Sequence, residues 1–289
     1  MVYFLLLLTA LAWSANFVIA KEALRELPPL ALLFLRVLFS TLLLLALYFG
    51  LRRHRRERLT AADWRRFGWL GLFGIALNQT GFTVGIHYTS VGHSALIISL
   101  TPIFVLLLAT RMKLESFTHL KVLGMSLAFA GVAVLTLEHG LNSRSPTLLG
   151  DLITLGGSLA FTVYTVTGKQ VAVRYDTLTL NTFMYLAGAS IVLPLTGWQL
   201  ATVDWTSVSW RGWLGALYMA AVASVAAYLM FFYALRRLSA SRVVVFSYLQ
   251  PVLATLLAVL WLHEPVTVHL AAGGSLVLLG VYLTERGRG

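Results

Sequence analysis

The chain is built from long apolar runs separated by short polar segments. Each run has roughly 18–25 residues, the length that an α-helix needs to cross a bilayer. The pattern predicts ten membrane-spanning helices, at residues 2–21, 30–50, 68–88, 93–110, 120–138, 149–169, 178–197, 212–236, 242–262 and 268–285. Little sequence remains between these runs, so we expect an all-α integral membrane protein without a soluble domain.

A longer-range pattern repeats along the chain at an offset of 149 residues. The repeated residues are a proline, a glutamate and two glycines: Pro102, Glu115, Gly124 and Gly131, then Pro251, Glu264, Gly273 and Gly280. Each unit has room for five helices, and an odd number places the second unit in the bilayer upside down. The sequence therefore predicts two inverted five-helix repeats, residues 1–140 and 141–289. Secondary transporters use this arrangement, with a substrate site near the bilayer midplane.

Composition supports the membrane interpretation and orients the chain. The sequence is 58% hydrophobic, 11% charged and without cysteine, so disulfides and thiolate chemistry are excluded. The net charge of +11 comes from basic residues between the apolar runs. With the N-terminus in the cytoplasm, 17 Lys and Arg residues fall on the inner side and 4 on the outer side. We expect a multi-pass protein of the cytoplasmic (inner) membrane, with both termini cytoplasmic and no nucleic-acid partner.

The repeated residues lie within longer motifs. The first copy reads YTSVG at 88–92, then Thr101-Pro102 and Glu115, and the second reads YALRRLSA at 233–240, then Gln250-Pro251 and Glu264. Together with WSAN at 13–16, these motifs resemble the EamA-type carriers of the drug/metabolite transporter superfamily, which include the YddG-type amino-acid exporters. One departure is that Leu114 and His263 replace the glycine that usually precedes the motif glutamate.

The resemblance implies a ten-helix carrier whose central cavity is lined mainly by helices 1, 3, 4, 6, 8 and 9. It also implies export of amino acids, other metabolites or toxic compounds.

Polar and aromatic residues at mid-membrane depth are the candidate substrate ligands. A buried amide is costly unless it is paired, so these side chains should face inward. The alternative is hydrogen bonding between helices, worth roughly 0.6 kcal/mol each. The candidates are Trp13, Asn16, Asn78, Gln79, Ser99, Tyr164, Tyr228, Tyr248 and Gln250.

Arg36 is a basic residue well inside an expected span. It is a candidate charge partner for the substrate. The alternative is that its side chain extends toward the outer face and pairs with Glu22 or Glu26.

The repeated prolines and glutamates have separate expected roles. Pro102 and Pro251 lie inside expected spans, where each would kink its helix, either for gating or for packing. Glu115 and Glu264 lie in tight turns, where a carboxylate can cap the start of the next helix. We therefore assign both glutamates to structural turns.

These observations predict a secondary transporter that moves a small organic solute outward by alternating access. The solute is expected to be an amino acid, aromatic amino acids included, or a related metabolite. No phosphate-binding loop and no metal motif occur, so no catalytic residue, cofactor or metal is expected. A multidrug exporter of the same fold is the alternative, followed by an integral-membrane enzyme or a passive channel. The expected partners are a small-molecule substrate and the lipid bilayer, with a monomer as the expected assembly. Proton coupling and facilitated diffusion both remain open.

Overall fold

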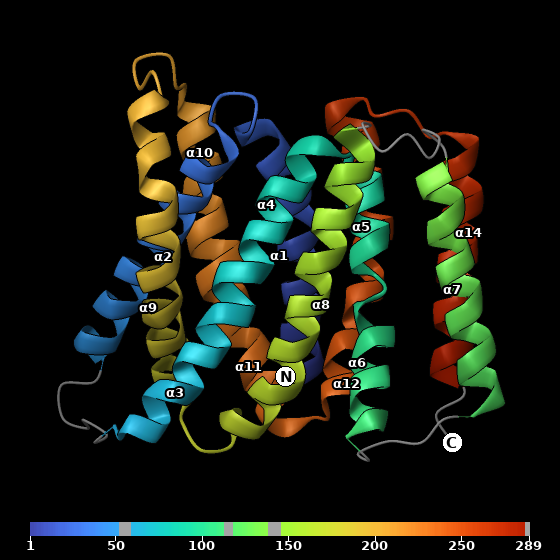
Figure 1. Ribbon diagram of the computed structural model, residues 1–289, viewed down its shortest axis with the longest axis horizontal. Coiled ribbons are helices and arrows are strands. Elements are labelled where there is room, and N and C mark those ends of the chain that lie inside the picture. The colour runs from blue at the N-terminus through green and yellow to red at the C-terminus, as the bar shows by residue number, and fades with distance from the viewer. Residues whose placement is uncertain (52–58, 113–117, 138–145, 287–289) are drawn as a thin grey trace.

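A computed structural model describes residues 1–51, 59–112, 118–137 and 146–286 of the protein. The described chain is predominantly helical, and its helices stand side by side in one bundle (Figure 1). We call the end that carries the α4–α5 turn the upper end, and the end that carries the α11–α12 turn the lower end, as drawn in Figure 1. Residue 115 and the expected helix ends at 138 lie outside the described residues.

The first half contains eight helical segments. They are α1 (Val2–Ala23), α2 (Pro29–Leu51), α3 (Ala61–Leu70), η1 (Gly71–Leu77), α4 (Asn78–Tyr88), α5 (Val91–Ile98), α6 (Thr101–Arg111) and α7 (His119–Leu137).

The second half contains eleven helical segments. They are α8 (Pro146–Ala172), α9 (Thr177–Thr196), η2 (Gly197–Thr202), α10 (Trp210–Tyr218), η3 (Met219–Ala226), α11 (Ala227–Arg237), α12 (Ala240–Val244), η4 (Val245–Tyr248), α13 (Leu249–Leu257), η5 (Ala258–Leu262) and α14 (Val268–Arg286).

Seven helical stretches of the described chain are long and apolar enough to cross a membrane. They are Val2–Ala23, Pro29–Leu51, Val91–Leu108, Pro146–Ala172, Thr177–Thr202, Trp210–Arg237 and Arg242–Leu262. Large apolar side chains such as Leu11, Leu42, Leu256 and Trp261 are exposed on their outward faces. An outer surface of this kind suits a lipid environment and would be unusual in water.

Two of the helical rods contain a π-helical turn in their middle. The rod from α3 to α4 contains η1, and the rod from α10 to α11 contains η3. The first rod also begins at Ala61, seven residues before the expected start, because a capping box between Thr60 and Asp63 initiates it. Its first turns carry Arg65 and Arg66, and their charge hid this start from the hydropathy pattern.

The sequence suggested that Pro102 and Pro251 each kink a continuous α-helix, but neither proline lies in the interior of one. Pro102 lies in the first turn of α6, after an interruption at residues 99–100. Pro251 lies in the first turn of α13, after the 3₁₀ segment η4. A proline costs little in a first turn, because the N–H that it lacks would be unpaired there. Each proline therefore starts a new helical segment within its rod.

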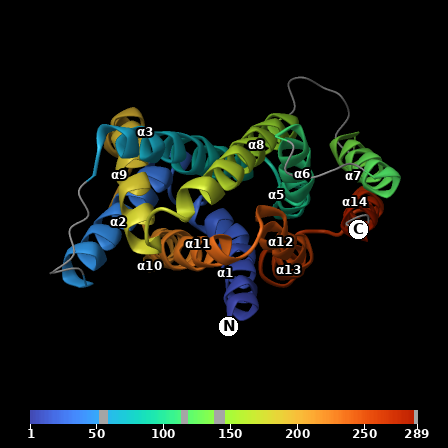
Figure 2. The ribbon, with the colours of Figure 1, turned by 90° about the horizontal axis from the view of Figure 1, so that it is seen from below.

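The repeated glycines have the same spacing in both copies, and the packing of α7 against α14 at one side of the bundle explains it (Figures 1 and 2). A Cβ on Gly131 would lie 2.6 Å from the carbonyl oxygen of Gly273, and one on Gly280 would lie 2.4 Å from that of Gly124. Both distances are shorter than real contacts, so these helices approach closely only because the side chains are absent. The contacts are also reciprocal, since each helix uses the glycines at equivalent positions of the two copies.

Candidate functional site

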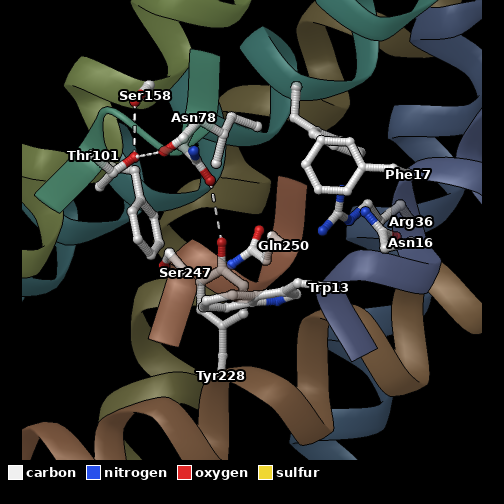
Figure 3. A pocket seen from close by; sticks show the side chains of 13 residues that line it. Trp13, Asn16, Phe17, Arg36, Asn78, Thr101, Ser158, Tyr228, Ser247 and Gln250 are labelled. Atoms are coloured by element: carbon white, nitrogen blue, oxygen red, sulfur yellow. Dashed lines mark hydrogen bonds between the residues drawn. The ribbon is translucent and has the colours of Figure 1, made fainter. Parts of the chain in front are cut away.

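A cavity of about 70 Å³ lies inside the bundle, between helices of both halves of the chain (Figure 3). Its walls come from the first, third, fourth, sixth, eighth and ninth expected spans, and α2 contributes Arg36. The lining residues are Trp13, Asn16, Phe17, Arg36, Asn78, Phe82, Ile98, Thr101, Ser158, Phe161, Tyr228, Ser247 and Gln250. A cavity of about 150 Å³ can hold benzene, so a larger solute would require the surrounding helices to separate.

Trp13 forms one wall of the cavity and is held from two directions. Its indole N–H donates to the carbonyl oxygen of Ala223, at 2.9 Å, within the π-helical turn η3. Its ring packs edge-on against Phe161 and Tyr228, with centroids 5.7 Å away in each case. Phe231 closes the cluster at 5.5 Å from both Trp13 and Phe161. This aromatic cluster separates the cavity from a smaller space of about 10 Å³ that Leu6 and Phe246 help to line.

Arg36 brings a positive charge to the cavity wall. Its side chain is only 3% exposed, and its Nε donates to Ser224 Oγ at 2.9 Å. Its Nη1 is buried without a hydrogen-bond partner. In Figure 3 the guanidinium points into the space that Gln250 and Asn78 also face.

The alternative placement of Arg36, paired with an acidic residue near the outer face, is wrong. Glu22 pairs instead with Arg25 at 2.8 Å. Glu26 accepts hydrogen bonds from the backbone N–H and the hydroxyl of Ser209, each at 2.7 Å, and these bonds lower the pKa of Glu26. Both carboxylates are thus engaged at the upper end of α1 and α10, and Arg36 lies deeper.

Neutral polar groups complete the cavity. The hydroxyl of Tyr228 donates to Asn78 Oδ1 at 3.2 Å, which joins the second half to the first. Thr101 and Ser158 share a hydrogen bond of 2.8 Å between their hydroxyls. Asn16 Oδ1 is buried and lacks a donor. The site therefore combines aromatic walls, amide groups and one unneutralised guanidinium.

Four residues predicted as ligands lie outside the cavity. Gln79 donates to the hydroxyl of Tyr185 at 2.7 Å, and Ser99 donates to the carbonyl oxygen of Leu96 at 2.6 Å. Tyr164 is fully buried and donates to the sulfur of Met184. Tyr248 packs at the edge of the hydrophobic cluster around Leu96 and Val277. Gln79, Tyr164 and Tyr248 thus contribute to packing between helices, and Ser99 bonds to the backbone at the end of its own helix.

Several cavity residues were absent from the predicted set. Apolar residues give no polarity signal at mid-membrane depth, and single hydroxyl residues are common there, so helical spacing was the available indicator. Phe17 follows Trp13 by four residues, Phe82 follows Asn78 by four, and Phe161 follows Ser158 by three, so each pair shares a helix face. The residues missed are Phe17, Phe82, Ile98, Thr101, Ser158, Phe161 and Ser247.

Glu264 connects the two halves and does not cap the helix that follows it. Its Oε1 accepts from the backbone N–H of Val91, the first residue of α5, at 3.1 Å. The start of α14 is capped instead by Thr267, whose hydroxyl accepts from the N–H of Leu270. Its counterpart in the first copy, Glu115, lies outside the described residues. The Glu264 carboxylate therefore has a structural role, since it joins the turn before α14 to the start of α5 at the upper end.

A buried hydrogen-bonded pair, His93 and Asp151, lies near the upper ends of α5 and α8, and no sequence pattern pointed to it. His93 Nδ1 is 3.1 Å from Asp151 Oδ2, with both side chains at most 5% exposed. Thr89 donates to the other carboxylate oxygen at 2.6 Å. The pair joins the two halves above the cavity.

A cavity between apolar helices from both halves of the chain is typical of membrane transporters. The chain belongs to the EamA-like transporter family, whose sequence profile matches residues 1–137 and 148–286.

Named relatives extend over nearly the whole chain. An uncharacterized transporter of Archaeoglobus fulgidus is 30% identical over 287 residues, covering 98% of this chain and 96% of its own. A "Probable terminal-alkyne amino-acid exporter" of Streptantibioticus cattleyicolor is 27% identical, with 97% and 92% covered. A "Probable amino-acid metabolite efflux pump" of Salmonella typhimurium is 26% identical, with 98% and 94% covered.

A solved crystal structure supports the fold alone. It covers 98% of both chains with a TM-score of 0.71 at 21% sequence identity.

Proposed function

We propose that the protein is a secondary transporter that carries an amino acid or a related metabolite outward across the cytoplasmic membrane. The observation that carries this proposal is the cavity between the two halves, lined by aromatic rings, amides and Arg36. Polar groups that converge in an otherwise apolar pocket are the usual features of a small-molecule site. The names of two relatives, an amino-acid exporter and an amino-acid metabolite efflux pump, favour this solute class.

In this proposal the chain crosses the membrane ten times, as two inverted repeats. The seven long apolar stretches would be joined by the α3–α4 rod, α7 and α14. The reciprocal glycine contacts between α7 and α14 support a two-fold relation, because such an axis duplicates every contact.

Two lysines provide a second sign of the same relation. Lys21 donates to the carbonyl oxygens of Ile86 and Thr89, at 2.8 and 2.6 Å. Lys169 donates to those of Leu235 and Leu238, at 2.6 and 2.8 Å. Ile86 and Thr89 precede Leu235 and Leu238 by 149 residues, and Lys21 precedes Lys169 by 148. The bonds of Lys21 nevertheless lie at the upper end of the bundle and those of Lys169 at the lower end. Equivalent hydrogen bonds at opposite ends of the bundle support an inverted relation between the two halves.

The orientation in this proposal follows the basic residues. Arg65, Arg66 and Arg174 gather around one surface groove near the lower end. The positive-inside rule then places the lower end, with both termini, in the cytoplasm.

A multidrug exporter of the same fold remains the alternative. Cationic drugs usually require an acidic counter-charge, and the described residues that line the cavity include Arg36 but no Asp or Glu. This distribution of charge disfavours cations and supports a solute that carries a carboxylate.

A ligand-induced thermal-shift screen followed by liposome uptake tests the proposed function. Purified protein should be stabilised by one or more amino acids or their derivatives, because a ligand that binds only the folded state raises its melting temperature. The same compounds should be taken up by proteoliposomes. Trp13→Ala should abolish both effects, and the matched control Trp64→Ala, at an exposed position on α3, should not. Stabilisation and uptake restricted to lipophilic cations would favour the multidrug alternative.

A further inference from the structure

Arg36 is a buried charge that no described residue neutralises. It makes no ion pair within the described chain, and the two nearby acidic residues in sequence, Glu22 and Glu26, are engaged elsewhere. A guanidinium stays protonated at every accessible pH, so Arg36 cannot avoid the cost of a buried charge by losing a proton. An isolated buried charge of this kind is strongly unfavourable.

The guanidinium is held in place, and one of its nitrogens is buried without a partner. Its Nε donates to Ser224, and its Cζ lies 5.7 Å from the centre of the Phe82 ring. Its Nη1 has no partner, although the group lines the cavity. Buried donors are normally paired, and a fixed guanidinium with free N–H groups matches the two oxygens of a carboxylate.

The remaining polar groups of the cavity are neutral. Asn16 Oδ1 lacks a donor, so it can accept from an N–H or O–H group of a bound solute. A neutral oxygen can accept a hydrogen bond from an ammonium as well as from an amide, but it does not neutralise the ammonium charge. Among the described lining residues the net charge is therefore +1, and a zwitterion would leave that charge in place.

We infer that the transported solute is a monocarboxylate anion, bound through its carboxylate to Arg36, and that each transport cycle moves one negative charge. This inference rests on the proposed function and narrows its substrate class to acids whose amino group is absent, acylated or otherwise uncharged. A dianionic phosphate would require further cations, which the described cavity walls lack.

A direct consequence concerns the energy source. After a full cycle the carrier returns to its starting state, so the charge moved equals the charge of the solute. A membrane potential that is negative inside drives a monoanion outward without any proton relay. At 100 mV, the concentration ratio at equilibrium shifts by roughly 50-fold.

The test uses purified full-length protein in liposomes, with valinomycin and a potassium gradient to set the potential. The probes are leucine, alanine and phenylalanine, each as the free amino acid, the N-acetyl acid and the amide. We expect the N-acetyl acids to exchange about tenfold or more faster than the free amino acids, and the amides not to exchange. At 100 mV the N-acetyl acids should accumulate on the positive side, toward the 50-fold ratio.

Arg36→Gln should abolish exchange of the N-acetyl acids, with Arg25→Gln, at an exposed arginine, as the matched control. Arg36→Lys keeps the charge and should retain part of the activity. The probe series and the voltage dependence of the unmodified protein do not depend on whether these variants fold.

Two results separate the failure of this inference from the failure of the proposed function. If free amino acids exchange saturably but their flux does not depend on the membrane potential, the proposed carrier function is supported and the monoanion inference is wrong. If no compound of the panel exchanges, both are wrong.

Discussion

At the scale of single residues, the cavity depends on a few hydrogen bonds that connect the two halves. Trp13 on α1 and Tyr228 on α11 both contact residues from the opposite half, Ala223 and Asn78. Within a membrane such bonds contribute only roughly 0.6 kcal/mol each. Their main effect is therefore on the position of the side chains around the solute.

Tyr228→Phe removes one hydroxyl and leaves the aromatic ring in the Trp13 cluster. We expect a twofold to fivefold rise in KM, in line with the loss of about 0.6 kcal/mol or slightly more, and little change in melting temperature. Tyr282→Phe, at an exposed tyrosine on α14, is the control. An equal loss of transport in both variants would remove Tyr228 from the site.

Glu264 should be important for stability and unimportant for the solute. Glu264→Ala leaves the N–H of Val91 without its acceptor, and loss of a helix-capping carboxylate costs about 1 kcal/mol. We expect a lower melting temperature and yield, with solute affinity unchanged in the protein that folds. Thr267→Ala, which removes the cap of α14, should behave in the same way. Loss of binding in well-folded Glu264→Ala protein would make this carboxylate a ligand.

At the scale of elements, the apolar runs located the helical rods but not their internal structure. Hydropathy reports the length and depth of an apolar run. A π-helical turn such as η1 or η3 depends instead on which neighbouring side chain forms hydrogen bonds with the backbone groups that the turn leaves unpaired. In η3 that neighbour is Trp13 of the opposite half, whose indole N–H donates to the carbonyl oxygen of Ala223. The same reason explains the predicted ligands that lie outside the cavity. Gln79 has the expected depth, but depth alone does not determine which face of the helix a residue occupies.

Some site residues were accessible from the sequence and others were not. Asn78 and Gln250 stood out as amides inside apolar runs, and both line the cavity. The hydrogen-bonded pair of His93 and Asp151 joins residues 58 positions apart, so only the packing of α5 against α8 reveals it.

The two lysine ties should control which end of the bundle opens. Lys21→Met removes the tie at the upper end, and Lys169→Met removes the tie at the lower end. The chain has no cysteine, so a single cysteine at Phe82 reports access to the cavity. We expect Lys21→Met to increase its labelling by an impermeant maleimide from outside intact cells, and Lys169→Met to increase it in inside-out vesicles. Identical effects of both substitutions on both sides would contradict the assignment of opposite gates.

At the scale of the whole molecule, the inverted-repeat arrangement can be tested by topology. Reporter fusions after Gly50 and Arg242 should report the cytoplasm, and a fusion after Pro265 should report the outside, because the basic residues orient the helices. The measurement is the ratio of a cytoplasm-active to a periplasm-active reporter at each position. A cytoplasmic signal at Pro265 would contradict the inverted-repeat topology.

The central claim is that a solute crosses the membrane inside the cavity between two halves that open in turn. Counterflow in proteoliposomes measures this most directly. Vesicles are loaded with an unlabelled solute from the thermal-shift screen, and entry of the labelled solute is followed. A carrier that alternates predicts saturable entry with a transient overshoot, which is absent in Trp13→Ala and retained in Trp64→Ala. Entry that rises linearly with concentration and shows no overshoot would identify a passive channel and contradict the account.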